Sequence, residues 1–470
     1  MPSASRTRPP VRALVLIDAA QAVPLWRQIY EQIRGAITSG RLAAGVRLPA
    51  SRALAADLVV SRNSVTAAYA QLRAEGYLVQ RGRVGTFVAS LEPDRVEMSV
   101  LPARARKAVS VTAGRRPLSR VGTLALAAAE RLPPAARGEP VPFRIGEPAT
   151  DVFPVRVWSR LVARNWRGGR VPLGYVDPAG ARPLREAIAE YLNGSRGVRC
   201  EWQQVFIVSG TQQAVDMAMR LVLSPGDAVW IEDPCYSGAR SAIDASSVSA
   251  VSVPVDSEGI SVDEGLRLEP KARAVYVTPS HQFPLGAVMS VSRRMALLGW
   301  AASADAWIIE DDYDSEFRYA SRPLPSLQGL DEQGRVIYVG TFSKTLFPGL
   351  RVGYLVSPPG LVDAFQAAFA LGGRYASADA QLVVTEFITE GHFERHLRRM
   401  RAVYASRQAA LLTYAQDHLS EWLDVSPSAA GLHLIGWIRD RGTSAAKIIE
   451  RAAGAGVELR ALSHYTQRVP

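Results

Sequence analysis

Lys344 is one of only four lysines among the 55 basic residues of this 470-residue chain. It lies in the run Thr341-Phe342-Ser343-Lys344, and Arg351 follows seven residues later. Arginine keeps its proton in a protein, whereas a desolvated lysine can act as a nucleophile and form a Schiff base with an aldehyde. In a chain that otherwise uses arginine for positive charge, Lys344 therefore indicates amine chemistry. A surface lysine left by biased codon usage is the alternative.

A second group of candidate residues follows a short apolar segment at 307–310. Asp311, Asp312 and Tyr313 come directly after this segment, and α/β proteins bind ligands outside the carboxyl ends of their strands. A carboxylate there could hold a pyridine nitrogen protonated, which makes the ring an electron sink. A metal site or a solvated acidic turn are the alternatives from these residues alone.

A third candidate is a phosphate-binding turn. The run Ser209-Gly210-Thr211-Gln212-Gln213 ends an apolar segment and opens a helical stretch. Its backbone N–H groups could hold a phosphate at the positive end of that helix. A glycine turn before a helix is common, so the run is weak evidence by itself.

The pattern after Phe143 predicts the scaffold for these candidates. Short apolar segments alternate with helical stretches, and the segments expected to be strands are 205–208, 228–231, 274–277, 307–310, 336–339 and 352–356. Strands that alternate with helices indicate a mostly parallel sheet. We therefore predict an α/β fold, and we find no internal repeat.

Charge is distributed unevenly along the chain. Residues 1–120 hold 19 Arg and Lys against 7 Asp and Glu, a net charge of +12, and the remainder holds 36 against 37, a net charge of −1. Such asymmetry suggests an acidic polymer or a membrane surface as the partner of the first part alone. A solvated basic tail is the alternative. The length predicts at least two domains.

Cysteine content and hydropathy bear on the compartment. The two cysteines, Cys200 and Cys235, give no disulfide framework, which fits a reducing cytosol. The apolar stretch 13–17 is too short for a signal peptide, and no later segment reaches transmembrane length. We expect a cytoplasmic protein without a membrane partner.

The first part of the chain predicts three helices followed by a hairpin. Ile29, Ile33 and Ile37 recur every fourth residue within 22–39 and form one helical face. Segments 51–58 and 61–75 carry similar apolar stripes, and two short strands, 77–79 and 86–88, follow with Gly82 and Gly85 between them. This order is that of a winged helix-turn-helix.

Arginines and short polar side chains gather at the starts of the second and third helices. Helix N-termini suit phosphates, and arginine can bond guanine edges in the major groove. Ser61 also fits a helix N-cap, which is the structural alternative for that residue. The predicted DNA contacts, which include the turn of the hairpin, are Arg47, Ser51, Arg52, Ser61, Arg62, Asn63, Ser64, Arg81, Gly82 and Arg83.

The N-terminal module resembles the GntR family of bacterial regulators. The resemblance rests on Leu48-Pro49-x-Ser51-Arg52-x-Leu54-Ala55, on Ser61-Arg62-Asn63-Ser64-Val65 and on Gly85-Thr86-Phe87-Val88. It implies a double-stranded DNA operator as a partner.

The order of parts in the second module resembles the fold type I aminotransferases, which bind pyridoxal 5′-phosphate. The parts are the turn at 209–213, an aromatic after Glu232-Asp233-Pro234, the loop 278–286, the acidic strand end, and Ser343-Lys344 with the distal Arg351. The resemblance implies Lys344 as the Schiff-base lysine and Asp311 as partner of the pyridinium nitrogen. It implies Tyr313 and His281 near the ring hydroxyl, where ordinary aminotransferases usually have Asn in place of His281, and Tyr236 stacked on the ring. The implied phosphate ligands are Gly210, Thr211, Gln212, Thr341, Ser343 and Arg351, with Tyr175 from the neighbouring subunit. No metal is implied.

The combination of a GntR-like N-terminal module, here called the head, with this second module resembles the MocR-type subfamily of regulators. Residues 278–286 and the run Glu310-Asp311-Asp312-Tyr313-Asp314 resemble the sequence motifs of that subfamily. The resemblance implies a head-to-tail homodimer that senses an amino compound or the cofactor itself. Such domains normally continue beyond the position of Pro470 with a segment that helps to hold a substrate carboxylate. The candidates for that role here are Arg460, Arg468 and Arg240.

We thus expect a tail at 1–20, a winged helix-turn-helix domain at 21–90, a linker at 91–142 with a helical piece at 124–131, and an aminotransferase-like domain at 143–470. Two functions remain open. The first is a transcription regulator with pyridoxal 5′-phosphate as a Schiff base on Lys344. The second is a working aminotransferase tethered by its DNA-binding head, because one lysine can serve both. Accumulation of a 2-oxo acid would distinguish the two.

Overall fold

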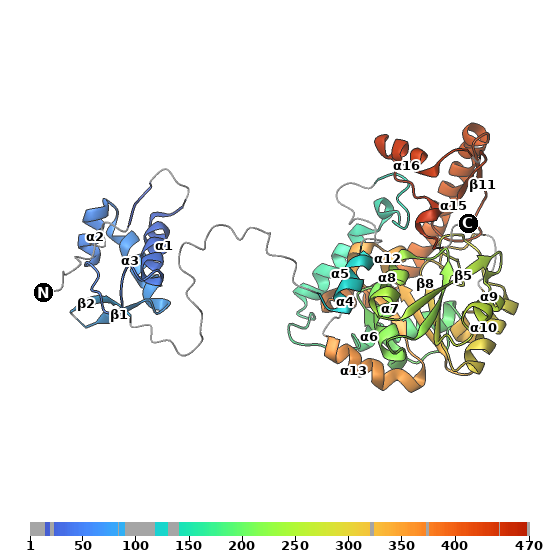
Figure 1. Ribbon diagram of the computed structural model, residues 1–470, viewed down its shortest axis with the longest axis horizontal. Coiled ribbons are helices and arrows are strands. Elements are labelled where there is room, and N and C mark those ends of the chain that lie inside the picture. The colour runs from blue at the N-terminus through green and yellow to red at the C-terminus, as the bar shows by residue number, and fades with distance from the viewer. Residues whose placement is uncertain are drawn as a thin grey trace, which may run out of the picture. The chain divides into compact units, whose positions relative to one another are not determined.

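The computed structural model describes residues 15–18, 23–82, 84–89, 118–129, 141–319, 324–372, 376–440 and 442–467. The chain divides into two compact units, 1–117 and 118–470, and both are drawn in Figure 1. Arg83, Arg468, most of the predicted tail and most of the predicted linker lie outside the described residues. No helix in the described ranges is long and apolar enough to cross a membrane.

The first unit is a winged helix-turn-helix, as predicted. Its elements are α1 (Leu25–Thr38), α2 (Ser51–Leu58), α3 (Arg62–Ala74), β1 (Leu78–Arg81) and β2 (Gly85–Val88). The stripe of Ile29, Ile33 and Ile37 on α1 is buried against Leu54 of α2 and Leu72 of α3. The β1 and β2 strands pair antiparallel, from Leu78 opposite Val88 to Arg81 opposite Gly85. The hydrophobic stripes thus meet in one small core, which fixes the three helices against each other.

The second unit is built on an eight-stranded sheet in the order β3-β10-β9-β8-β7-β4-β5-β6. The strands are β3 (Val205–Val208), β4 (Ala228–Asp233), β5 (Ser249–Asp256), β6 (Gly259–Ile260), β7 (Ala274–Val277), β8 (Trp307–Asp312), β9 (Val336–Thr341) and β10 (Gly353–Val356). The neighbours from β5 through β4, β7 and β8 to β9 are parallel, whereas β10 runs antiparallel to β9 and β3. This is the mostly parallel sheet that the sequence predicts.

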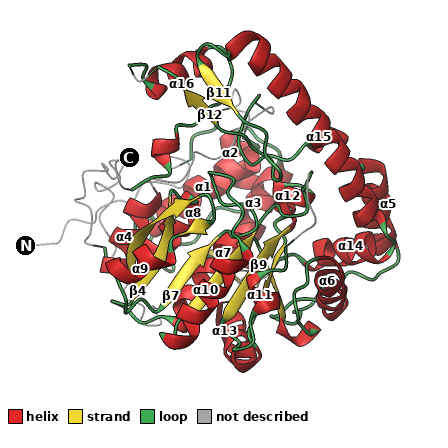
Figure 2. Cartoon of the chain, turned by 90° about the vertical axis from the view of Figure 1, so that its right-hand side faces the viewer, coloured by secondary structure: helices red, strands yellow, loops and turns green. Residues whose placement is uncertain are grey.

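Helices lie on either side of this sheet, as Figure 2 shows. They are α4 (Arg120–Ala129), α5 (Val155–Arg167), α6 (Arg182–Ser195), α7 (Thr211–Val222), α8 (Ser237–Ala245), α9 (Val262–Leu268), α10 (Val291–Ser303), α11 (Leu327–Leu330), α12 (Phe342–Thr345), α13 (Val362–Gly372) and α14 (Ala378–Thr389). Alternate residues of β3 serve the two faces: Ile207 joins a core with α5, α6 and α14, and Phe206 joins a core with α7, α8 and α13. The central strands are therefore buried on both faces.

A smaller part follows the sheet. It contains the long α15 (His392–Leu419), a two-stranded antiparallel sheet of β11 (Leu423–Val425) and β12 (Gly436–Ile438), and α16 (Ala445–Gly454). Short 3₁₀ turns complete the second unit at Thr150–Val152, Trp202–Gln204, Pro348–Leu350, Pro359–Leu361 and Leu462–His464.

Two segments differ from their sequence-based description. The α4 helix lies inside the segment predicted as linker, begins earlier than the expected helical piece, and packs against α8. Residues 15–18, in the predicted tail, lie against the first helix of the head: Val15 is buried, and the Leu16 amide donates to Gln32 Oε1 at 2.8 Å. Both segments therefore contact a folded unit.

Candidate functional site

The predicted site residues meet at one edge of the large sheet because of its topology. The strands β3, β4, β7, β8 and β9 end there and are followed by Gly210, Tyr236, His281, Tyr313 and Lys344, respectively. The antiparallel β10 begins at the same edge, since Gly353 lies opposite both Thr341 and Val208. Arg351, just before this strand, is thereby brought to the edge as well.

Asp311, near the end of β8, is buried with one oxygen unsatisfied. The Tyr276 hydroxyl donates to Asp311 Oδ2 at 2.6 Å, whereas Oδ1 has no hydrogen-bond partner. Burial raises the pKa of Asp311 to about 7, and the hydrogen bond from Tyr276 opposes this rise. A buried, unpaired carboxylate oxygen is costly, so the position suits a ligand that donates a hydrogen bond.

Lys344 lies on the short helix α12 and reaches toward the segment before α5. Its Nζ donates to the carbonyl oxygen of Gly146 at 2.7 Å. Burial lowers the pKa of the Lys344 amine, while the charges of Asp314 and Asp311 oppose that shift. A lowered pKa raises the fraction of neutral amine, which is the nucleophilic form.

Tyr313 and His281 form a hydrogen-bonded cluster with Asp314. His281 Nδ1 lies 3.0 Å from Asp314 Oδ2 and 3.0 Å from the Tyr313 hydroxyl. A carboxylate only accepts, so Nδ1 carries the proton, and the Tyr313 oxygen can share it as a second acceptor. The Tyr313 hydroxyl proton is then free to be donated elsewhere.

His433, which sequence reasoning missed, joins this cluster from the segment before β12. Its ring lies 4.9 Å from that of His281, and its Nε2 donates to the Pro284 carbonyl at 2.9 Å. Burial lowers the pKa of His433 to about 4. Ligand atoms of His281, Asp314 and His433 lie within 4.8 Å of one another, a spacing that could also hold a metal ion.

The predicted phosphate ligands surround the start of α7. A Cβ on Gly210 would lie 3.6 Å from the Arg351 guanidinium, and Gly210 has a φ of +139°, so a side chain is disfavoured there. The Arg351 guanidinium makes no hydrogen bond or ion pair within the described residues, whereas the Arg351 backbone amide donates to the Pro348 carbonyl at 3.3 Å. Thr341 Oγ1 accepts from the Ser343 amide at 3.1 Å, and Gln212 Nε2 donates to the Gly238 carbonyl at 2.9 Å. Thr211 is the first residue of α7. An unpaired guanidinium beside a helix N-terminus is a suitable place for a phosphate.

The two predicted tyrosines are placed differently. Tyr236, at the start of α8, packs edge-on against Phe283 at 6.0 Å, and Phe283 in turn contacts Tyr313. Tyr236 is 37% exposed, and its partial burial together with the charge of Asp311 raises the pKa of its hydroxyl. Tyr175 is fully exposed, with no part in the cluster of its own chain.

Two of the three candidates for holding a carboxylate, Arg460 and Arg240, are already paired. Arg460 Nη2 lies 3.1 Å from Glu458 Oε1, and Glu458 Oε2 accepts from Arg144 Nε at 2.7 Å. Arg240 pairs with Asp244 on the same helix at 3.1 Å. A carboxylate ligand would therefore compete with a protein carboxylate at either arginine.

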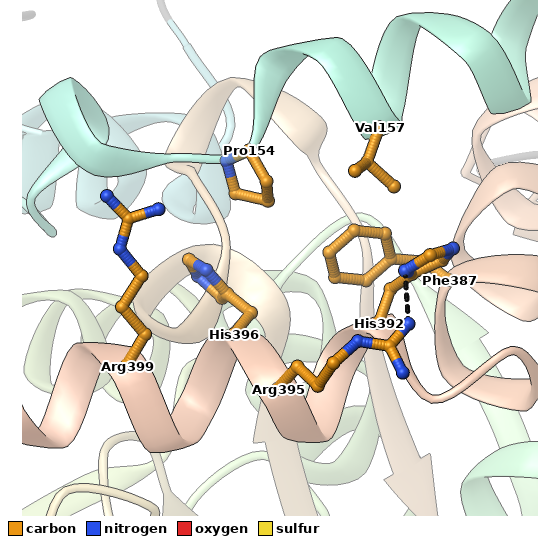
Figure 3. Close-up of a pocket in the computed structure, with 7 residues that line it drawn as sticks. All are labelled: Pro154, Val157, Phe387, His392, Arg395, His396 and Arg399. Carbon is orange, nitrogen blue, oxygen red and sulfur yellow. Dashed lines mark hydrogen bonds between the residues drawn. The ribbon is translucent and has the colours of Figure 1, made fainter.

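A separate cavity of about 140 Å³ lies between the start of α5 and the first turns of α15 (Figure 3). His396 in its wall donates from Nε2 to the carbonyl of Thr345, the residue after Lys344, at 2.9 Å. The wall of the cavity is therefore hydrogen-bonded to the end of α12. Its lining residues are Pro154, Val157, Phe387, His392, Arg395, His396 and Arg399, and sequence reasoning selected none of them.

In the head, the predicted DNA contacts lie on an exposed surface. Arg52, Arg62 and Asn63 are exposed at the first turns of α2 and α3, Ser51 and Ser64 are half-buried there, and Gly82 is exposed in the turn of the hairpin. Ser61 is an N-cap, since its Oγ accepts from the Ser64 amide at 3.2 Å. Arg47 packs along Gly85, and the Arg81 guanidinium lies 5.3 Å from the centre of the Phe87 ring. These two arginines therefore pack against the β1–β2 hairpin, here called the wing, and also give it positive charge.

Comparisons with known proteins identify both units. Residues 25–88 match the family described as bacterial regulatory proteins, gntR family, and residues 142–443 match the family described as aminotransferase class I and II. The chain is 42% identical to the probable rhizopine catabolism regulatory protein MocR of Rhizobium meliloti, over 96% of this chain and 89% of the relative. The chain belongs to the MocR-type subfamily of GntR-family transcription regulators.

A second transcriptional regulator and two solved aminotransferases are also similar to this chain. The pyridoxine biosynthesis transcriptional regulator PdxR of Corynebacterium glutamicum is 30% identical, over 93% of this chain and 88% of its own length. Among solved structures, the kynurenine aminotransferase of Pyrococcus horikoshii is 29% identical with a TM-score of 0.64, over 75% of this chain and 87% of that chain. The α-aminoadipate aminotransferase LysN of Thermus thermophilus is 28% identical with a TM-score of 0.65, over 72% of this chain and 88% of that chain. The second unit of this MocR-type regulator therefore has the fold type I aminotransferase fold.

Proposed function

We propose that this MocR-type regulator binds pyridoxal 5′-phosphate covalently on Lys344 and uses it to sense an amino compound. The observation that carries the proposal is the unpaired Oδ1 of Asp311, buried at the strand end beside Lys344. The ring nitrogen of the cofactor would donate to this oxygen. Two of the solved relatives support the choice of group, since one is described with PMP and the other with a phosphopyridoxyl compound.

Each remaining residue has a role toward that group. When bound, the cofactor supplies an aldehyde that exchanges amines and a ring that withdraws electrons. Arg351, Gly210, Thr211, Gln212, Thr341 and Ser343 would hold the phosphate. Tyr313 would donate its free hydroxyl proton to the oxygen of the cofactor's ring hydroxyl, while His281 and Asp314 hold the Tyr313 oxygen in place. Tyr236 would cover one face of the cofactor ring. Lys344 would release the cofactor to an incoming amine.

The exposed surface of the head would bind the operator. Arg52 and Arg62 at two helix starts, with Arg81 in the wing, supply the charge that a DNA backbone attracts. We further propose a homodimer in which Tyr175 of each subunit reaches the phosphate in the other. The full exposure of this side chain within its own chain favours such a role.

A catalytically active aminotransferase with a tethering head is the second candidate. The lysine that exchanges amines can also shuttle the proton that transamination requires. The favourable observation is the likeness to the two aminotransferases named above. The amount of 2-oxo acid formed per protein chain separates the candidates: a sensor forms none beyond a single turnover.

The proposal is tested by the visible absorption spectrum of the purified full chain before and after borohydride, with peptide mapping of the reduced protein. An adduct on Lys344 is expected. A protein that takes up no cofactor, or an adduct on another lysine, overturns the proposal.

A further inference from the structure

Residues 141–147, here called the latch segment, are tied to the rest of the second unit at three points. Gly146 accepts from Lys344 Nζ at 2.7 Å, and the Pro142 carbonyl accepts from the Glu458 amide at 3.0 Å. Arg144 bonds Glu458 Oε2 from Nε at 2.7 Å. Only the first of these ties involves the reactive amine.

The latch segment contains a residue with an unfavourable backbone conformation. Phe143 has a φ of +65°, a region that bulky side chains rarely occupy, and its ring is largely exposed. Such backbone persists only where the surroundings impose it. The ties at Pro142, Arg144 and Gly146 together therefore hold the segment in place.

Gly146 also limits where the amine can lie. Its φ is +81°, and a Cβ built on it would be only 2.8 Å from Lys344 Nζ. Only glycine lets the backbone approach the amine so closely.

Resting on the proposed function, we propose that Gly146 is a positioning residue for the Lys344 amine and that attachment of the cofactor releases the latch segment. The ammonium group of Lys344 has three hydrogens. When its nitrogen adds to the aldehyde carbon, the carbonyl oxygen leaves as water with two of these hydrogens. The protonated C=N nitrogen retains one hydrogen, and it would donate this hydrogen in a hydrogen bond to the ionised ring oxygen of the cofactor instead of to Gly146. Gly146 then has no donor, and the strained segment is held at Glu458 alone.

The consequence can be measured as hydrogen exchange of the backbone amides. In the full chain, pyridoxal 5′-phosphate should speed exchange in 141–147 and at Glu458 by roughly tenfold or more, since a charge-assisted bond is lost. Pyridoxamine 5′-phosphate is the matched control, because it lacks the aldehyde and leaves the ammonium intact. Equal acceleration by both compounds, or acceleration by neither, overturns the proposal.

Two variants of Lys344 test the latch without any cofactor chemistry. Lys344→Met removes the donor, so the cofactor-free variant should exchange as fast as the loaded wild type. Lys344→Arg keeps a donor but forms no covalent bond, so its segment should stay protected when pyridoxal 5′-phosphate is added. A cofactor-free Lys344→Met protein with the wild-type exchange rate contradicts the proposal, whether or not the wild type takes up cofactor.

Positioning by Gly146 is tested by the kinetics of attachment. Gly146→Ala should slow covalent attachment at least tenfold, because the added methyl group displaces the amine, while the affinity for pyridoxamine 5′-phosphate changes little. Gly360→Ala is the control, since Gly360 has open space around it and no left-handed φ. Equal attachment rates in the two variants refute the role. A wild-type protein that forms no adduct on Lys344 refutes the proposed function instead.

Discussion

The Tyr276 hydroxyl donates to Oδ2 of Asp311 at 2.6 Å and leaves Oδ1 of the same carboxylate bare. The tyrosine comes from the middle of β7 and the aspartate from the end of the neighbouring strand β8, with Tyr276 opposite Ile309 in the register. One oxygen is thus fixed by the sheet and the other is directed to a ligand. The pair explains how a buried carboxyl group is oriented while one of its oxygens stays available to a ligand.

We predict that Asp311→Asn weakens binding of pyridoxal 5′-phosphate by about 10- to 100-fold, because the amide loses a charge-assisted hydrogen bond to the ring nitrogen. Fluorescence titration of the cofactor-free full chain measures the affinity. Tyr276→Phe is the control that loosens the carboxylate but keeps its charge, and its effect should be smaller. Wild-type affinity in Asp311→Asn would exclude the assigned role.

Arg351 provides a test of the phosphate site. We expect Arg351→Gln to lower affinity for pyridoxal 5′-phosphate by about 10- to 100-fold, as for the loss of a bond between charged groups. Affinity for pyridoxal, which has no phosphate, should be unchanged. Arg407→Gln, which removes an exposed ion pair with Asp151, is the control and should bind both compounds normally. An equal loss for both compounds would place Arg351 elsewhere than at the phosphate.

The head predicts a salt-dependent loss of DNA binding. Arg52→Ala and Arg62→Ala should each weaken operator binding, and a residue that contacts a phosphate should reduce the salt slope of binding by about 1. Electrophoretic mobility shifts at several salt concentrations give both values. Arg27→Ala, on the exposed face of α1 where Arg27 pairs with Glu31, should bind normally. If both variants also bind normally, the recognition surface is assigned to the wrong helices.

Glu232 predicts a pH dependence of stability. Burial raises its pKa to about 7 from the ordinary 4.5, although Thr278 and Gln282 donate to it. The folded state therefore keeps a proton that the unfolded state releases, so the stabilising contribution is present below pH 4.5 and is lost as the pH rises through 7. Between pH 5.5 and 7.5 this group should lower the free energy of unfolding by about 2 kcal/mol.

Glu232→Gln should remove that part of the pH dependence. Urea unfolding of the full chain, followed by tryptophan fluorescence at pH 5.5 and 7.5, measures it. The exposed Glu332→Gln should keep the wild-type difference between the two pH values. A Glu232→Gln protein with the same difference would show that Glu232 titrates alike in the folded and unfolded states.

The sequence predicts those features of the molecule that depend on residues close together in the chain, and it does not predict those that depend on contacts between distant residues. The strand at β8 and the acidic residues after it lie together in the chain, so both were predicted from a short window. The β5 strand was missed because Ser249, Ser252 and Pro254 give it a polar, turn-like composition, although it pairs with β4 from Ser249 to Pro254. The pairing supplies what local propensity lacks.

The same distinction holds at the candidate site. Lys344 and Asp311 stand in recognisable local runs, whereas Tyr276, Gly146 and His433 become relevant only through contacts made in the folded chain. Gly146 lies 198 residues from Lys344 in sequence, and no periodicity relates the two. Their roles depend on strand register and loop path, which a pattern of residue types does not specify.

The position of the antiparallel strand β10 affects the order in which the second unit folds and takes up its cofactor. It is the last strand of the large sheet in the chain and lies between β9 and β3, so it joins the earliest strand to the later ones. Until β10 inserts, β3 has no hydrogen-bonded neighbour in the sheet, so the Gly210 turn is joined to the Lys344 helix only through the packing of α7 on β8 and β9, and sheets closed by such distant pairings form slowly. A nascent or truncated chain without β10 would have each half of the ring and phosphate site but no complete one. Cofactor uptake during synthesis would therefore begin only after β10 has emerged, and it would stabilise completed sheets in preference to partial ones.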